Sequence, residues 1–276
     1  MLDYTGKSAN KLKEKTLYLL DMDGTIYNEN EIFDGTLEFL KEIERRGGQY
    51  VFITNNSSKS VEDYVQKVRD MGIKAEYENF YTSGQATAMY LKENYPNQVV
   101  YCMGTKSLIK ELREAGIEVV TEVDERASVV LLGFDTENTS EKIRNTCIML
   151  GRDVAYLATN PDLVCPVSFG YIPDCGSMSI MLKNATGKEP FFIGKPEPIM
   201  VNCVLKKLNC KREAAVIVGD RLYTDIKTGA NAKVDTICVL SGEASMEDIL
   251  QGEVEPTYIF KSVKEIYEGL TEETEL

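Results

Sequence analysis

The chain has 276 residues, of which 43% are hydrophobic, and a formal net charge of −13 from 44 acidic and 31 basic residues. This composition excludes a disordered chain, and the acidic balance argues against nucleic acid or an anionic membrane as a partner, since both attract cationic surfaces. The sequence contains no histidine, which excludes serine–histidine and cysteine–histidine nucleophiles, histidine zinc sites and histidine acid–base catalysis.

The seven cysteines are scattered along the chain and form no C-x-x-C pair. An odd number of cysteines in a chain of this length indicates reduced, buried thiols in a cytosol. The lysines near the amino terminus are not followed by an apolar stretch as long as that of a signal peptide, and the apolar runs have the length of strands. We therefore expect a cytoplasmic protein without a transmembrane helix.

The predicted elements alternate between strands and helices. The first apolar run, Leu17 to Leu20, has no polar alternation, which indicates a strand buried on both faces. The other elements follow in order, with strands predicted at 50–54, 79–83, 98–104, 128–134, 154–160, 191–195, 214–220 and 235–242, and helices at 34–46, 60–72, 84–94, 107–116, 141–151, 199–208 and 224–232. The acid-rich stretch from about 245 is predicted as helix–strand–helix. This alternation is typical of an α/β fold with parallel sheets.

The length of the chain predicts two domains. An α/β core of about five strands needs far fewer residues than this chain has. The segment 84–188 has strands and helices of its own, and it lies between the two blocks that carry the polar residues described next. We predict a core domain formed by 1–83 and 189–276, with 84–188 as a second α/β domain inserted into it.

Polar residues follow four of the predicted strands at the point where each strand ends. In an open parallel sheet these ends meet at one edge, where ligands bind. Each residue also has an ordinary local explanation as a turn, a helix cap or a solvated lysine. Their occurrence at four strand ends favours one common site. The residues are Asp21 and Asp23, Thr54, Asn55 and Asn56, Lys195, and Asp220 with Asp225.

These residue types fit phosphoryl transfer. Asp21 and Asp220 can supply the hard oxygen ligands that Mg²⁺ prefers. One carboxylate can attack phosphorus, and a neighbouring carboxylate can protonate the leaving oxygen. The compact positive charge of Lys195 is suited to pairing with a phosphate oxygen or with the nucleophile. Thr54 and Asn55 can donate hydrogen bonds to a ligand. This chemistry needs no histidine.

The same residues lie in motifs that resemble those of the haloacid dehalogenase (HAD) superfamily. Four motifs occur in the superfamily's order, namely DMDGT (21–25), ITNN (53–56), GKPEP (194–198) and GDRLYTD (219–225). Two more resemble signatures of the large α/β cap of the nitrophenylphosphatase-like (NagD-type) branch, namely ATNPD (158–162) and GYIPDCGS (170–177). The resemblance implies a Rossmann-like parallel-sheet core with an inserted α/β cap.

The resemblance also implies roles for the acidic residues. Asp21 would be the nucleophile and a magnesium ligand. Asp23 would be the general acid and base, with its backbone carbonyl on the metal. Asp220 would complete the metal site, and Asp225 would support it without binding the metal.

The remaining motif residues would bind the substrate. Thr54, Asn55, Asn56 and Lys195 would bind its phosphate group. In some relatives a histidine occupies the cap loop in which this chain has Cys165, and we interpret Cys165 as a packing or pocket-lining residue, with a reactive thiol as the alternative.

The cap residues Asn160 and Asp162 are interpreted as structural, with shaping of the substrate pocket as the alternative. Cap-to-cap dimers occur in the related group, so a homodimer through the cap is a further expectation.

The resulting expectation is a Mg²⁺-dependent phosphatase that hydrolyses a small phosphomonoester through an aspartyl-phosphate. An aspartate at the second position of the first motif resembles the phosphatases of the superfamily. A phosphotransferase or mutase on the same core is the alternative. An aspartate-phosphorylated regulatory domain is disfavoured, because the acidic residues of such domains precede the lysine. The sequence leaves open whether the substrate is a sugar phosphate, a nucleotide, glycolate phosphate or another ester.

Overall fold

The computed structural model describes residues 1–272, which form two compact units, each built on its own sheet. The six-stranded unit contains residues 1–53, 65–81 and the chain from Pro196 onward, and the five-stranded unit contains residues 54–64 and 82–195. Both sheets are parallel where their register is defined and are joined by helices, which confirms the predicted α/β class. The division into a core domain and an inserted cap stays a prediction. None of the helices in residues 1–272 combines the length and apolar character that a membrane crossing requires.

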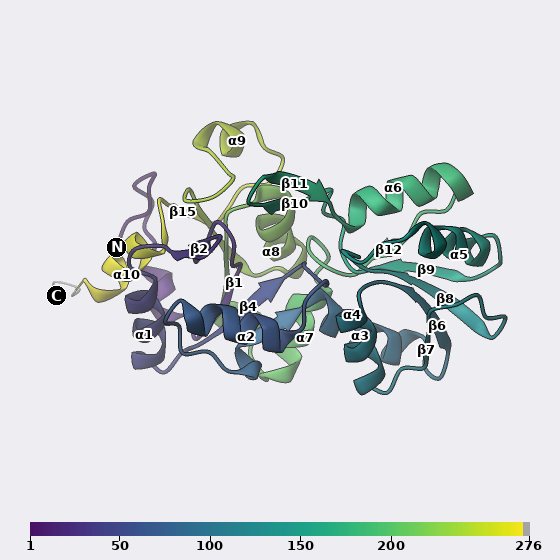
Figure 1. Cartoon of the computed structure of the whole chain (residues 1–276). Coiled ribbons are helices and arrows are strands. Elements are labelled where there is room, and N and C mark those ends of the chain that lie inside the picture. Colours follow the sequence, from purple (N-terminus) through teal and green to yellow (C-terminus); the bar gives the residue numbers. More distant parts are fainter. Residues whose placement is uncertain (273–276) are drawn as a thin grey trace. The chain divides into compact units, whose positions relative to one another are not determined.

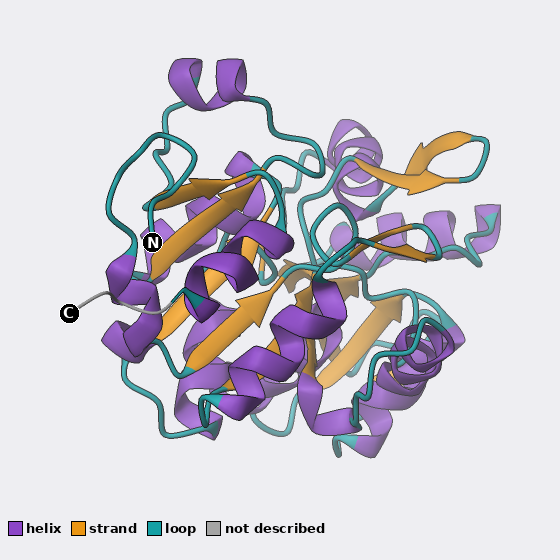
Figure 2. Ribbon diagram, turned by 90° about the vertical axis from the view of Figure 1, so that its left-hand side faces the viewer, coloured by secondary structure: helices purple, strands orange, loops and turns teal. Residues whose placement is uncertain are grey.

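The sheet of the six-stranded unit has the order β15-β14-β13-β1-β4-β5, and Figure 2 draws its strands as orange arrows. Strand β1 lies at the centre and pairs in parallel with β13 on one side and β4 on the other. All four residues of β1 are buried, in agreement with its uninterrupted apolar sequence. The strands are β1 (Leu17–Leu20), β4 (Gln49–Thr54), β5 (Phe80–Thr82), β13 (Ala215–Gly219), β14 (Asp235–Val239) and β15 (Tyr258–Phe260).

Amphipathic helices accompany this sheet. Helix α1 buries Phe39, Leu40 and Ile43, which recur at helical spacing, and it packs against α10. The helices are α1 (Thr36–Arg45), α7 (Ile199–Lys207), α8 (Lys227–Ala232), α9 (Met246–Gln251) and α10 (Val263–Thr271). Helix α2 (Val61–Asp70) begins in the five-stranded unit and continues in this one from Val65 onward. A five-residue π-helix (Leu222–Ile226) precedes α8, and two short strands, β2 (Tyr27–Asn28) and β3 (Glu31–Ile32), form a small hairpin after β1.

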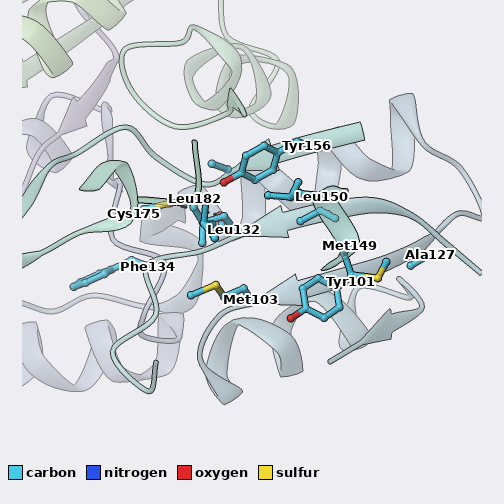
Figure 3. Close-up of a cluster of buried hydrophobic side chains, with 12 residues drawn as sticks. Tyr101, Met103, Ala127, Leu132, Phe134, Met149, Leu150, Tyr156, Cys175 and Leu182 are labelled. Atoms are coloured by element: carbon cyan, nitrogen blue, oxygen red, sulfur yellow. Dashed lines mark hydrogen bonds between the residues drawn. The ribbon is translucent and has the colours of Figure 1, made fainter. Parts of the chain in front are cut away.

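The sheet of the five-stranded unit has the order β12-β9-β8-β6-β7. Its central strands and flanking helices enclose a cluster of buried apolar side chains, including Tyr101, Leu132, Met149 and Leu182 (Figure 3). The strands are β6 (Val99–Met103), β7 (Val119–Val120), β8 (Ala127–Leu132), β9 (Ala155–Ala158) and β12 (Phe191–Phe192). The helices are α3 (Ser83–Asn94), α4 (Lys106–Glu114), α5 (Ser140–Leu150) and α6 (Cys175–Thr186), all labelled in Figure 1.

An antiparallel hairpin separates β9 from α6 in the chain, and the sequence pattern did not predict it. Its strands are β10 (Val164–Val167) and β11 (Gly170–Pro173). Both strands contain a proline and residues that are only half-buried or exposed, so the segment lacks the apolar run that marks the other strands. Cys165 lies half-buried on β10 and packs against the hydrophobic cluster.

Candidate active site

Three carboxylates converge where two neighbouring strands of the six-stranded sheet end. Asp21 follows β1 and Asp220 follows β13, and these strands are paired in parallel. Asp225 comes from the π-helix after β13. One carboxylate oxygen from each residue lies within 4.8 Å of those of the other two, and Asp220 and Asp225 are buried. Three hard oxygen donors this close together fit a divalent cation such as Mg²⁺.

The Asp220 carboxylate packs against two glycines, at positions where a side chain would not fit. A Cβ atom added to Gly24 or to Gly242 would collide with Asp220 Oδ2. Gly24 also has φ +84°, a left-handed conformation that suits the turn after β1. The backbone N–H of Glu243 donates a hydrogen bond to Asp220 Oδ2 over 2.8 Å. The loop after β14 therefore fixes the orientation of this carboxylate.

Arg221 balances part of this negative charge, and the sequence reasoning missed it. Its Nε lies 2.9 Å from Glu243 Oε2. Burial disfavours the guanidinium cation, but the carboxylates of Asp21 and Asp220 outweigh that effect and raise the pKa of Arg221. The signal was present in the sequence, since Arg221 directly follows Asp220 at the strand end.

Asp23, two residues after Asp21, contacts a tyrosine and a lysine. Its side chain is exposed, its Oδ2 accepts a hydrogen bond from the Tyr27 hydroxyl over 3.4 Å, and its Oδ1 lies 3.8 Å from Lys67 Nζ. Lys67 also lies over the Tyr27 ring, 4.0 Å from its centroid. The Asp23 carboxylate therefore has a cation and a hydroxyl beside it. The position of Lys67 beside Asp23 was not predicted, because a lysine on an amphipathic helix such as α2 is normally interpreted as a solvated residue.

Asn55 and Lys195, both in the five-stranded unit, are joined by two hydrogen bonds that we call the Asn55–Lys195 clamp. The Asn55 Oδ1 accepts a hydrogen bond from the Lys195 backbone N–H over 2.7 Å, and the Asn55 Nδ2 donates one to the Lys195 carbonyl over 2.9 Å. Both residues are buried, with 8% and 3% of their surface exposed. One side chain thus holds both polar groups of the Lys195 backbone.

Thr54 and Asn56 flank Asn55 and shape a turn. Thr54 is the last residue of β4, and its Oγ1 accepts a hydrogen bond from the Asn56 backbone N–H over 3.2 Å. The Asn56 Oδ1 accepts hydrogen bonds from the backbone N–H and the hydroxyl of Ser58. The predicted residues therefore form two groups, the acidic residues in the six-stranded unit and Thr54, Asn55, Asn56 and Lys195 in the five-stranded unit. The chemical roles predicted for them stay predictions.

The comparisons with known protein families and with known proteins agree on one family. Residues 18–118 match the family described as haloacid dehalogenase-like hydrolase, and residues 192–266 match the family described as HAD-hydrolase-like. An acid sugar phosphatase from Staphylococcus saprophyticus is 35% identical over 259 residues, which cover 94% of this chain and 99% of that protein.

Two solved structures resemble this one along nearly its whole length. A 4-nitrophenylphosphatase from Thermotoga maritima superimposes with a TM-score of 0.90 at 37% identity, covering 95% of this chain and 99% of that one. A glycerol phosphate phosphatase from Mycobacterium tuberculosis, solved in complex with magnesium, has a TM-score of 0.86 at 27% identity, covering 92% of this chain and 77% of that one.

Proposed function

The chain belongs to the haloacid dehalogenase-like hydrolases, in their nitrophenylphosphatase-like (NagD-type) phosphatase branch, and from this premise we propose that it hydrolyses small phosphomonoesters with Mg²⁺ through an aspartyl-phosphate on Asp21. The observation that carries this proposal is the convergence of the Asp21, Asp220 and Asp225 carboxylates within 4.8 Å. Similar proteins are named for sugar, glycerol and nitrophenyl phosphates, which makes sugar and polyol phosphates the first substrates to test.

The proposed metal ligands come from the converging carboxylates and from the turn after β1. Asp21 and Asp220 would hold Mg²⁺, together with the backbone carbonyl of Asp23. Asp225, whose carboxylate lies close enough to bind the metal itself, would support them. Negative charge on the phosphoryl oxygens would be neutralised by Mg²⁺ bound there. Arg221 would limit the repulsion among these acids.

The proposed reaction has two steps. In the first, an Asp21 carboxylate oxygen attacks phosphorus, the bond to the leaving oxygen breaks, and the Asp23 carboxyl gives that oxygen a proton. In the second, the Asp23 carboxylate takes a proton from a water molecule that attacks phosphorus, which releases inorganic phosphate and restores Asp21. Thr54, Asn55, Asn56 and Lys195 are proposed to bind the phosphate.

We also propose that residues 84–188 form a cap domain that selects the leaving group, inserted into a core of 1–83 and 189–276. Closure of such a domain would keep bulk water from the chemical step. The substrate's leaving group would then decide which esters react fastest.

The test is phosphate release from 4-nitrophenyl phosphate and from a panel of sugar and polyol phosphates, each titrated with Mg²⁺. We expect the wild type to be active, Asp21→Asn to lose turnover, and Asp220→Asn to need more Mg²⁺. The control is Asp153→Asn, which alters an exposed carboxylate of the five-stranded unit. A wild type that releases no phosphate from any ester at any Mg²⁺ concentration would overturn the proposal.

A further inference from the structure

A chain of buried polar side chains runs through the five-stranded unit behind the Asn55–Lys195 clamp. Asn55, Asp162, Asn160 and Asp174 have only 8%, 8%, 0% and 4% of their surface exposed. Burying polar groups is unfavourable unless they are hydrogen-bonded, and a buried carboxylate costs the most. Two such carboxylates, Asp162 and Asp174, therefore need an explanation.

Both N–H donors of the Asn55 carboxamide are used by protein partners. A carboxamide has two N–H donors, and those of Asn55 go to the Lys195 carbonyl over 2.9 Å and to Asp162 Oδ2 over 2.6 Å. Its Oδ1 accepts from the Lys195 N–H. The side chain of Asn55 therefore holds Lys195, and neither of its amide hydrogens is left to donate to a phosphate.

Asp162 and the Lys195 backbone together fix which way the Asn55 carboxamide faces. A carboxylate only accepts hydrogen bonds, so the Asn55 amino group must point toward Asp162. A flipped carboxamide would place Oδ1 against the Asp162 carboxylate and the amino group against the Lys195 N–H. Both contacts would be repulsive, and the clamp on Lys195 would be lost.

Asn160 and Asp174 hold Asp162 in its turn. The Asn160 Nδ2 donates to Asp162 Oδ2 and to Asp174 Oδ1, both over 2.9 Å. The Asn160 Oδ1 accepts from the Thr159 hydroxyl over 2.9 Å. Asp174 caps α6 by accepting the Cys175 backbone N–H. The chain of contacts is thus anchored at the start of a twelve-residue helix.

We propose that Asp162 is a positioning residue of the phosphatase reaction, acting through Asn55 on Lys195. The proposal rests on the proposed function, in which Lys195 binds the phosphate, and it assigns the phosphate contact of Asn55 to its backbone N–H. A lysine side chain has four rotatable carbon–carbon bonds, so the position of its ammonium group is reproducible only if its backbone is held in place. An error of about 1 Å in the position of a catalytic group can cost roughly a hundredfold in rate.

The first experiment compares Asp162→Ala with Asp162→Asn, using 4-nitrophenyl phosphate as substrate and inorganic phosphate as a competitive inhibitor. Asp162→Ala should lower kcat/KM by about 10- to 100-fold, the range for losing a hydrogen bond to a charged group, and raise the Ki of phosphate. Asp162→Asn should recover most of the loss, because its Oδ1 can still accept from Asn55 and Asn160. The exposed Asp153→Ala is the matched control.

The Ki of phosphate separates positioning from a merely structural role. A partly unfolded preparation loses apparent kcat but leaves Ki and KM of the folded fraction unchanged. If Asp162→Ala does not fold, Asp162→Ser, which keeps a polar group in the buried space, replaces it with the same expectation. Wild-type Ki and kcat/KM in the folded variant would overturn the proposal.

A double-mutant cycle tests the route through Asn55. Asn55→Ala removes the link, so adding Asp162→Ala to it should cause little further loss. Losses that multiply would show that Asp162 acts elsewhere and would overturn the proposal. An inactive wild type is a different outcome, because it contradicts the proposed function itself.

Discussion

Gly194→Ala is the sharpest perturbation that the structure offers for the Lys195 backbone. Gly194 directly precedes Lys195, and its N–H donates to the Thr159 carbonyl over 2.8 Å. A Cβ atom at this position would lie 2.5 Å from Asn55 Oδ1 and 2.5 Å from the Thr159 carbonyl oxygen, whereas ordinary contact begins at 3.4 Å. About 0.9 Å must therefore be cleared on each of two sides, one of them backbone.

The easier movement is that of the Asn55 side chain, and it breaks the clamp. Displacing Asn55 by about 1 Å, or Lys195 with it, should lower kcat/KM for 4-nitrophenyl phosphate by about a hundredfold. Overpacking of this kind should also lower the free energy of unfolding by about 1–3 kcal/mol. Steady-state kinetics and urea denaturation measure the two effects on the same preparation.

Gly151→Ala is the matched control. Gly151 lies in the same unit with φ −67°, and its added Cβ would be no closer than 3.3 Å to any atom outside its neighbours. It should therefore keep wild-type kinetics. A Gly194→Ala protein that is stable and turns over within a factor of about two of the wild type would refute the reasoning, because Lys195 would then not depend on this close packing.

Three further outcomes are expected. Burial and, to a smaller extent, nearby carboxylates raise the pKa of Glu111 from 4.5 to about 7. The contribution of Glu111 to the free energy of unfolding is therefore complete below pH 4.5, where the group is protonated, and is lost as the pH rises through 7. Glu111→Gln should thus raise the free energy of unfolding, measured in urea, by about 3 kcal/mol at pH 8 and by roughly half of that at pH 5.5; equal gains at both values would contradict the titration. Asp23→Asn should lower kcat/KM by roughly a hundredfold for glycerol phosphate. The loss should be smaller for 4-nitrophenyl phosphate, because its leaving group needs no proton. Equal losses for the two substrates would contradict the role of Asp23 as the general acid. Gly242→Ala should displace the Asp220 carboxylate and raise the Mg²⁺ concentration that gives half-maximal turnover by about tenfold. An unchanged Mg²⁺ titration would count against Asp220 as a metal ligand.

The sequence predicted the fold well because its signals are local. The uninterrupted apolar run of β1 and the strand–helix alternation require no knowledge of distant residues. The proximity of Asp21 and Asp220 needed only one further rule, that ligands bind at the carboxyl edge of parallel strands. The hairpin of β10 and β11 escaped prediction because each strand carries a proline and neither is buried.

Lys67 and Arg221 escaped for another reason, since their importance comes from what lies beside them. Lys67 is a charged residue on an amphipathic helix, a common pattern that normally means solvent. In the structure it lies beside Asp23 and over the ring of Tyr27. Arg221 follows a strand like many surface arginines, yet it is a cation held next to the converging carboxylates.

Asn55 shows the limit of sequence reasoning most clearly. A polar residue after β4 indicates an edge where a ligand could bind, and an asparagine there predicts a side-chain donor to phosphate. Whether that donor is available depends on Asp162, which is 107 positions further along the chain, and on the Lys195 carbonyl, 140 positions away. Both amide hydrogens are engaged by these partners, so the residue type alone could not predict which group of Asn55 would contact a phosphate. The ATNPD motif that contains Asp162 then gains a proposed reason for its carboxylate, because this acceptor joins the Lys195 backbone in fixing the Asn55 carboxamide.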